Sequence, residues 1–283
     1  MHSLKRAISC KLLPSIILSF FSFSATAQTQ IFFDDFESGD LSHTDNNFTW
    51  SNPTKTSVTT SNSKNGSHAL LFDFGYKETA EQRFVLGKSY KSISIEYDLY
   101  IPDGKEPYGG IIYDQYNADG GPTNDKFLRL WDKNDYSGNP EKIGSSTSGD
   151  TNTGLANHYT EWNSGDGMNW QGHDTQKTGF ITTADRGQWI HIKSYFKHAT
   201  ENNNDGVVKM YKNGELIYQR STVNNYHPSG DHAWFQGYLL GSRSGTSPAG
   251  KRLYLLIDNF EIWDGESSTP KPPSDVSVTL MPN

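Results

Sequence analysis

The sequence predicts an all-β protein, a sandwich or a barrel built from short antiparallel strands. Many short segments alternate apolar and polar residues with a period of two, which is typical of half-buried strands. Turn-forming Gly, Asn and Ser separate nearly all of these segments, and no long window shows helical periodicity. No internal repeat of fixed period is present, which argues against a propeller or a solenoid.

The first half of the chain reads as a succession of such strands. They are predicted over residues 30–36, 48–51, 56–60, 68–74, 81–86, 92–101 and 126–131. Residues 92–101 give the clearest pattern, because Ile93, Ile95 and Tyr97 share one face. Residues 132–178 are predicted to be largely loop, since Gly, Asn, Ser and Thr dominate there, and loops of that length are usually functional.

Residues 187–218 carry three consecutive antiparallel strands. Over residues 189–196 one face is apolar, whereas His191, Lys193 and Tyr195 share the other face. Asn213-Gly214 predicts a two-residue hairpin turn, because both central residues of a type I′ turn need a positive φ. Two further strands are predicted over residues 233–241 and 252–263.

The N-terminus predicts export. Residues 1–27 have a basic start, an apolar run too short to cross a bilayer, and small residues before a cleavage site after Ala27. We therefore expect a secreted protein with no membrane span. Residues 28–264 would form one β domain, and residues 265–283 a Pro/Ser/Thr-rich tail.

Cysteine usage and charge exclude several classes of function. The single cysteine, Cys10, lies in the predicted signal peptide, so the exported chain would have no disulfide and no thiol nucleophile. Loss of that peptide leaves 22 basic against 32 acidic residues, a formal charge of −10. So acidic a chain is not expected to bind nucleic acid. We also expect a monomer.

Several motifs resemble the concanavalin A-like (lectin/glucanase) superfamily. They are Gly187-Gln188-Trp189, Asp205-Gly206, Asn213-Gly214, residues 33–40 (FDDFESGD) and residues 256–259 (LIDN). This resemblance implies a jelly-roll β-sandwich of two antiparallel sheets. With residues 80–84 (AEQRF) and 126–131 (KFLRLW), the chain looks most like secreted bacterial polysaccharide lyases that act on uronic-acid polymers.

Two departures from related families affect the activity that the resemblance implies. Glucanase relatives carry Glu-x-Asp-x-x-Glu on one strand, but here Glu96 and Asp98 are followed by Ile101, which disfavours a glycoside hydrolase. The Gln-x-His motif of alginate lyases is also absent, since Gln188 and His191 are spaced differently.

The lyase resemblance implies a β-elimination site in the groove of the concave sheet. Such a site needs a base, an acid, and cations that neutralise the uronate carboxylate. The candidate residues are His191 and Tyr195 as base and acid, with Arg129, Lys193 and Arg83 as the cations. The alternative interpretation is an ordinary solvated strand face, with Arg83 in an ion pair with Glu81.

Aromatic residues suggest a second function, a noncatalytic carbohydrate-binding or adhesion module. Sugar rings pack their C–H faces on aromatic side chains, and a lysine can bind a carboxylate. The candidate substrate-binding residues are Trp131, Trp162, Trp170, Trp189, Tyr116 and Lys197. For any single tryptophan, a place in the core or as an anchor of a loop is the simpler explanation.

A structural Ca²⁺ site is the third expectation. In jelly rolls of this type the first and last strands hold the ion with carboxylates and carbonyls, and the matching positions are Asp35, Glu37, Gly39 and Asp258. A cysteine-free exported sandwich would gain stability from such a clip. The alternative is that these acids serve only turns and strand edges.

Overall fold

The structure is a computed structural model in which most of the chain between residues 28 and 267 is described. The described ranges are 28–75, 80–102, 124–133, 142–150, 155–163, 170–181, 183–201, 203–223, 233–241 and 253–267. The predicted signal peptide lies outside them, as does the tail beyond residue 267. Among these residues the only helical element is a 3₁₀ turn, Thr183–Asp185, so none of the described helices could cross a membrane.

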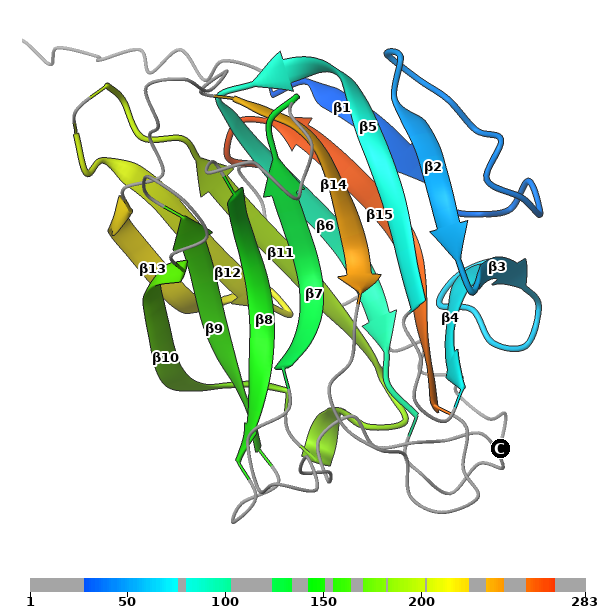
Figure 1. Ribbon diagram of the computed structural model, residues 1–283. Helices are drawn as coiled ribbons and strands as arrows, with labels where there is room; N and C mark the ends of the chain where they lie inside the picture. Colours follow the sequence, from blue (N-terminus) through cyan, green and yellow to red (C-terminus); the bar gives the residue numbers. More distant parts are fainter. Residues whose placement is uncertain are drawn as a thin grey trace, which may run out of the picture.

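Two antiparallel sheets face each other, and the second lies in front of the first in Figure 1. The first sheet has the order β13 (Glu215–Val223), β12 (Gly206–Lys212), β11 (Trp189–Lys197), β6 (Ser92–Tyr100), β15 (Leu253–Asp264), β4 (Ala69–Gly75) and β3 (Thr56–Thr59), with β1 (Gln30–Asp34) also paired to β15. The second has the order β10 (Trp170–Ile181), β9 (Leu155–Asn163), β8 (Lys142–Asp150), β7 (Asn124–Trp131), β14 (Trp234–Gly241), β5 (Ala80–Tyr90) and β2 (Thr49–Thr54). The predicted all-β sandwich of jelly-roll type is confirmed.

The prediction of a long loop over residues 132–178 is wrong. Strands β8, β9 and β10 occupy much of that segment and extend the second sheet by successive antiparallel pairs. Their sequences, such as KIGSSTSGD in β8, are polar on both faces, so the alternation that reveals a half-buried strand is missing. The structure describes the backbone of these three strands and not their side chains.

A core of aromatic and aliphatic side chains fills the space between the sheets. The first sheet contributes Ile95, Ile192 and Phe260, and the second sheet contributes Phe84 and Leu130. This burial follows from strand alternation, since every second residue of a strand points to the same face. The residues between them point away from the core, and these outward positions carry the functional side chains described below.

The centre of the first sheet is formed by strands distant in sequence. Strand β15 pairs with β6 along one edge, and with β4 and then β1 along the other. Strand β11 pairs with β6 over its whole length and with β12 on its other side. The predicted turn between β12 and β13 is confirmed, because Asn213 and Gly214 both have positive φ, at 50° and 84°.

Candidate functional site

Three outward side chains form a row across the middle of the second sheet. Tyr238 of β14 is the register partner of Arg83 on β5 and of Arg129 on β7. Neighbouring strands lie about 4.8 Å apart, so the three Cα atoms fall within roughly 10 Å of one another. We call these three residues the arginine row.

The row points away from the core because its neighbours in sequence point into it. Leu128 and Leu130 flank Arg129 and belong to the core between the sheets. Gly237, next to Tyr238, faces inward, since a Cβ there would meet Phe84 Cζ at 2.7 Å. Only glycine fits at that position. Because Gly237 has no side chain, β14 can pack directly against Phe84 and Leu130.

Contacts with Glu81 and Trp131 hold the row in place. Arg83 Nε donates to Glu81 Oε1 at 2.5 Å, and the Arg83 guanidinium lies 5.9 Å from the centre of the Trp131 ring. The Trp131 and Tyr238 rings lie 5.7 Å apart at an angle of 60°. Arg129, Trp131 and Tyr238 are buried, whereas the Arg83 side chain is 38% exposed and forms the solvent-facing end.

Arg83 and Arg129 were predicted from the sequence as site residues, whereas Tyr238 was not. Strand β14 is largely apolar, and Tyr238 lies more than a hundred residues from Arg129 in sequence. The available signal was alternation within β14, where Gln236 and Tyr238 share the face opposite Leu239. The strand order, which places β14 between β5 and β7, cannot be read from that alternation.

The other predicted catalytic residues lie on the opposite side of the molecule. His191, Lys193 and Tyr195 alternate in β11 with Ile190 and Ile192, which belong to the core, so they point outward from the first sheet. The sandwich therefore separates them from Arg83 and Arg129. The predicted catalytic set does not converge in one groove.

His191 lies between two carboxylates of β6. Its Nδ1 is 3.2 Å from Asp98 Oδ1 and its Nε2 is 3.3 Å from Glu96 Oε2, and all three side chains are buried. Burial alone would lower the pKa of His191, but hydrogen bonds and negative charge from Asp98 and Glu96 raise it to about 9. His191 is therefore an imidazolium at neutral pH.

The start of the predicted tail covers this cluster. Lys193 Nζ donates to the carbonyl oxygen of Ser267, and Ser267 Oγ donates to Glu96. Ser267 N donates to Ser94 Oγ at 2.9 Å. Glu266 binds Lys209 Nζ at 2.7 and 2.8 Å. The outer face of the first sheet is therefore a closed polar network.

Tyr195 and Lys197 complete the outward face of β11. Burial and the charge of Glu266 raise the pKa of Tyr195, and Lys209 Nζ lies 5.8 Å from the centre of its ring. Lys197 is half exposed and lies 3.6 Å from an oxygen of Asp205 at the entry to β12. Neither residue is near the arginine row.

The predicted aromatic platform is dispersed. Trp131 is buried beside the arginine row, whereas Trp189 packs on Tyr100 at 5.4 Å on the first sheet. Trp162 and Trp170 belong to the paired strands β9 and β10, whose side chains are not described. Tyr116 lies outside the described residues.

The predicted calcium ligands have other roles in this structure. Both oxygens of Glu37 accept hydrogen bonds from Ser67, and Oε1 also accepts from the backbone N–H of His68. Asp258 Oδ2 accepts from the backbone N–H groups of Lys64 and Asn65, at 2.7 and 3.1 Å. These two carboxylates therefore hold the loop between β3 and β4 from two sides.

N–H groups pointing at a carboxylate occupy the positions that a cation needs. Burial raises the pKa of Asp258 to about 6. Asp35 accepts from the backbone N–H of Glu37, and Gly39 has a φ of 82° in the adjoining turn. Across the described residues, no group of three or more His, Cys, Asp or Glu side chains is placed to hold a metal ion. The residues as arranged do not fit calcium, and the site stays a prediction.

Comparison with solved structures identifies the architecture. The chain is similar to an endo-β-1,4-glucuronan lyase from the fungus Trichoderma reesei, with a TM-score of 0.58 and 13% identity over 87% of this chain and 100% of that one. The fold is a jelly-roll β-sandwich like that of these solved structures. Alginate lyase Aly36B, solved with an alginate trisaccharide, matches with a TM-score of 0.52 and 13% identity over 76% of this chain and 87% of that one. A Chlorella virus alginate lyase matches with a TM-score of 0.51 and 12% identity over 77% of this chain and 93% of that one.

No protein-family model and no curated protein matches the chain. At identities this low the likeness to the lyases is one of fold, and the chemistry has to be argued from the side chains.

Proposed function

We propose that the chain is a polysaccharide lyase that cleaves a uronic-acid-containing polysaccharide by β-elimination. The observation that carries this proposal is the arginine row, in which two guanidinium groups flank a phenol on three adjacent strands. Two of the lyases that share the fold are named for their uronic-acid polymers, glucuronan and alginate. Their names support the choice of substrate class.

The reaction requires a cation at the substrate carboxylate. A base removes the proton on C5, next to the carboxylate, and the electron pair forms the C4–C5 double bond. The bond between C4 and the glycosidic oxygen breaks, and that oxygen takes up a proton. Arg83 and Arg129 can neutralise the carboxylate and stabilise the negative charge that develops on it, because a guanidinium binds a carboxylate through two parallel hydrogen bonds.

Tyr238 is the proton-transfer group of the row. Its phenol lies between the two arginines, so a carboxylate bound by either guanidinium brings the reacting C4 and C5 atoms close to it. As a phenolate, the Tyr238 oxygen would accept the C5 proton and become a phenol. It would then give that proton to the leaving glycosidic oxygen when both lie on the same side of the ring, which restores the phenolate. Tyr238 therefore replaces His191 and Tyr195 as the proposed acid and base.

The outer face of the first sheet is less suited to a uronate. His191 and Lys193 already face Asp98 and Glu96, and the register pairs Glu96 with a further acid, Glu261. A uronate placed there would meet three carboxylates and would have to displace Ser267. On the second sheet, Glu81 pairs with Arg83 and orients its guanidinium.

The noncatalytic module is the alternative, and the described side chains favour it less. A binding platform needs several aromatic rings on one face, but Trp131 lies on the second sheet and Trp189 on the first. Among the described side chains, Phe33 and Leu216 are the exposed large hydrophobic residues, and they lie on β1 and β13.

The test is the ultraviolet absorbance of the unsaturated uronate, at about 235 nm, during incubation with a panel of uronic-acid polysaccharides. β-Elimination creates this chromophore, whereas hydrolysis and binding do not. A steady rise on at least one polymer is expected. Retention on an immobilised uronate polymer with no rise on any member of the panel would overturn the lyase proposal in favour of the binding module.

A further inference from the structure

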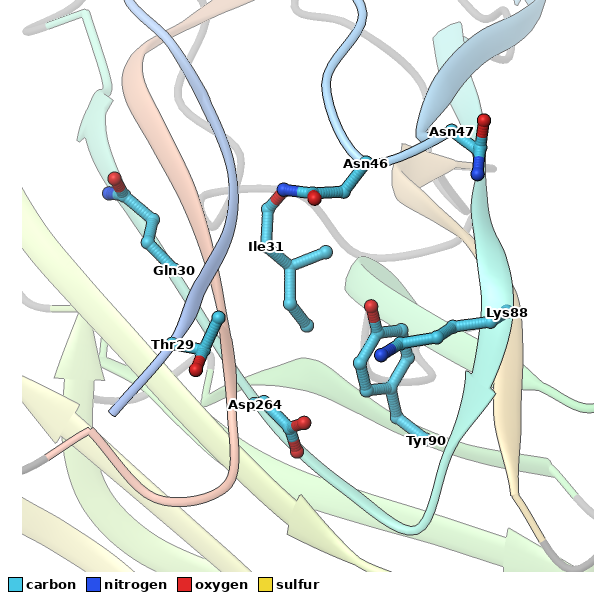
Figure 2. Close-up of a pocket in the computed structure, with 8 residues that line it drawn as sticks. All are labelled: Thr29, Gln30, Ile31, Asn46, Asn47, Lys88, Tyr90 and Asp264. Carbon is cyan, nitrogen blue, oxygen red and sulfur yellow. The ribbon is translucent and has the colours of Figure 1, made fainter. Parts of the chain in front are cut away.

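A polar pocket lies at one end of the sandwich, away from the arginine row. It has a volume of about 240 Å³ and opens where β1 begins and where β5 and β15 end. Figure 2 shows Lys88 and Tyr90 of β5 on one side, Ile31 and Asn46 above, and Asp264 below. Drug-sized ligands occupy sites of about 300–1,000 Å³, so this pocket suits a single small polar ring.

The wall formed by Asn46 and Asn47 is held rigidly. Asn46 Nδ2 donates to the carbonyl oxygen of Ile31 at 2.8 Å, and Phe48 stacks on Phe32 in the core at 3.6 Å. Both asparagines have positive φ, at 49° and 62°, in the left-handed region that asparagine adopts more readily than most residues. These contacts fix the polar groups of the wall before a ligand arrives, which lowers the entropy lost on binding.

Gly87 of β5 lies in close contact with the backbone of Asn47. It has a φ of 78°, and a Cβ on it would approach Asn47 Cβ and the Asn47 carbonyl oxygen to 2.7 Å. The close approach of backbone to backbone sets the position of Lys88, the next residue along. The pocket is therefore preformed by contacts on both sides.

Lys88 offers an ammonium group for an anion. Its side chain is exposed, and its Nζ lies 4.9 Å from the centre of the Tyr90 ring. Within the described part of the chain, Lys88 has no carboxylate within ion-pair distance. Burial and the charge of Asp264 raise the pKa of Tyr90 to about 12, so its hydroxyl stays a hydrogen-bond donor at neutral pH.

We propose that this pocket binds one uronate residue of an acidic polysaccharide, as a second contact point outside the arginine row. Lys88 would bind the carboxylate, and Tyr90, Asn47 and Asp264 would bind the ring hydroxyls. The Lys88 ammonium is complementary to the single carboxylate of a uronate ring. The amide, phenol and carboxylate around it can form hydrogen bonds with the ring hydroxyls. The choice of a uronate rests on the proposed lyase function.

The position on β5 gives the pocket a role in holding a long substrate. Lys88 lies five residues after Arg83 on β5, and the strand bulges there, since the five-residue step from Val85 to Tyr90 is matched by a step of only two residues on β14. The pocket lies at this bulge, less than about 17 Å from Arg83 along the strand. A polymer bound at both places gains affinity without any new contact at the reacting bond. The site should therefore affect KM for polymers and leave turnover at saturation unchanged.

Nuclear magnetic resonance titration with D-glucuronate tests the proposal, with D-glucuronamide as the uncharged match. The expected result is binding of glucuronate with shifts of the amides of Asn46, Asn47, Lys88 and Tyr90. Lys88→Ala should weaken that binding at least tenfold, about 1.4 kcal/mol. Lys91→Ala removes an exposed lysine outside the pocket and should leave binding unchanged.

Equal binding of glucuronamide, or no effect of Lys88→Ala, would overturn the proposal. So would an absence of shifts at these amides up to the solubility limit of the sugar. Arg83→Gln separates the two sites. If it alone abolishes glucuronate binding, the pocket proposal fails and the lyase proposal stands. If the amide shifts persist in Arg83→Gln while no polymer is cleaved by the native protein, the pocket is a sugar site and the lyase proposal fails.

Discussion

Tyr238 and Arg129 are register partners on β14 and β7, and both side chains are buried although they point away from the core between the sheets. A guanidinium held in a site of low dielectric interacts more strongly with a carboxylate than one in water does. The pair therefore supplies a cation and a phenol at fixed separation, which a β-elimination site needs.

Replacement of Tyr238 by Phe removes only the phenolic oxygen. Because that oxygen transfers the proton in the proposed reaction, we expect kcat to fall by about a hundredfold or more. The fold should be retained, since the ring still packs on Trp131. Initial rates of absorbance increase on the best polymer measure the effect, and circular dichroism confirms the fold.

Tyr195→Phe is the matched control, because Tyr195 lies on the outer face of the first sheet. It should keep native activity. If Tyr195→Phe lost activity and Tyr238→Phe kept native activity, the chemistry would lie on the first sheet.

Replacement of Arg83 by Lys keeps the charge but loses the planar pair of donors. The Arg83 guanidinium lies over Trp131 and is oriented by its hydrogen bond to Glu81. A lysine could keep these contacts but could not offer a carboxylate two parallel hydrogen bonds. We expect kcat/KM to fall by about tenfold or more, with the thermal midpoint nearly unchanged because the side chain is partly exposed. A steady-state comparison with Lys133→Arg, an exchange outside the row, provides the control. Unchanged kinetics in Arg83→Lys would remove Arg83 from the site.

The imidazolium of His191 predicts a loss of stability at alkaline pH. Its pKa is about 9 in the folded chain and 6.5 ordinarily, so the folded chain binds the proton more tightly. The resulting stability is fully present below pH 6.5 and is lost as the pH rises through 9. The shift corresponds to roughly 3 kcal/mol in the free energy of unfolding.

Urea unfolding at pH 6 and pH 10 checks this, with His191→Gln as the comparison. Glu96, Asp98 and Lys193 face His191 and are present in both proteins, so the difference between them isolates the imidazole. We expect the native protein to lose more stability than the variant between the two pH values. Equal losses would show that His191 is not charged in the folded chain.

Removal of the segment after Asp264 should destabilise the domain. Ser267 forms hydrogen bonds with buried Glu96 and Lys193, and Glu266 binds Lys209. A chain ending at Asp264 therefore loses these hydrogen bonds at buried charged groups. A loss of about 2 kcal/mol or more is expected in chemical unfolding. A chain ending at Pro270 keeps these contacts and should match the full-length protein. Equal stability of the two truncations would show that the contacts contribute nothing.

The loop between β3 and β4 gives a test of calcium binding. Asp258 accepts two backbone N–H groups of that loop, so we expect excess EDTA to leave the thermal midpoint unchanged. Asp258→Asn should lower the midpoint, because it replaces one of the two accepting oxygens by a donor. A midpoint that rises with added Ca²⁺ in the native protein, and not in Asp258→Asn, would establish the predicted calcium site.

The fold class was predictable because the core leaves a local signature. Strands such as β6 and β11 bury one face, and their alternation is visible in the sequence. The Asn213-Gly214 turn was predictable for the same reason, since its backbone requirement is local. Strands β8 to β10 were missed because a strand without an apolar face has no such signature.

The arginine row was only half predictable. Arg83 and Arg129 stand out as basic residues within apolar strands, but alternation cannot show which of two sheets a strand joins. His191 therefore looked as suitable as Arg129, and the sandwich places them on opposite outer faces. Tyr238 acquires its role only from the strand order, which places β14 between its two partners.

The central place of β15 has a consequence for how the chain reaches its native state. Strand β15 pairs with β6, β4 and β1, all of which precede it by more than a hundred and fifty residues. The larger sheet can therefore not assemble until residues 253–264 have been synthesised. Contacts of such long range cost loop-closure entropy before they contribute any stability, so we expect slow folding. During synthesis, incomplete chains should expose unpaired strand edges.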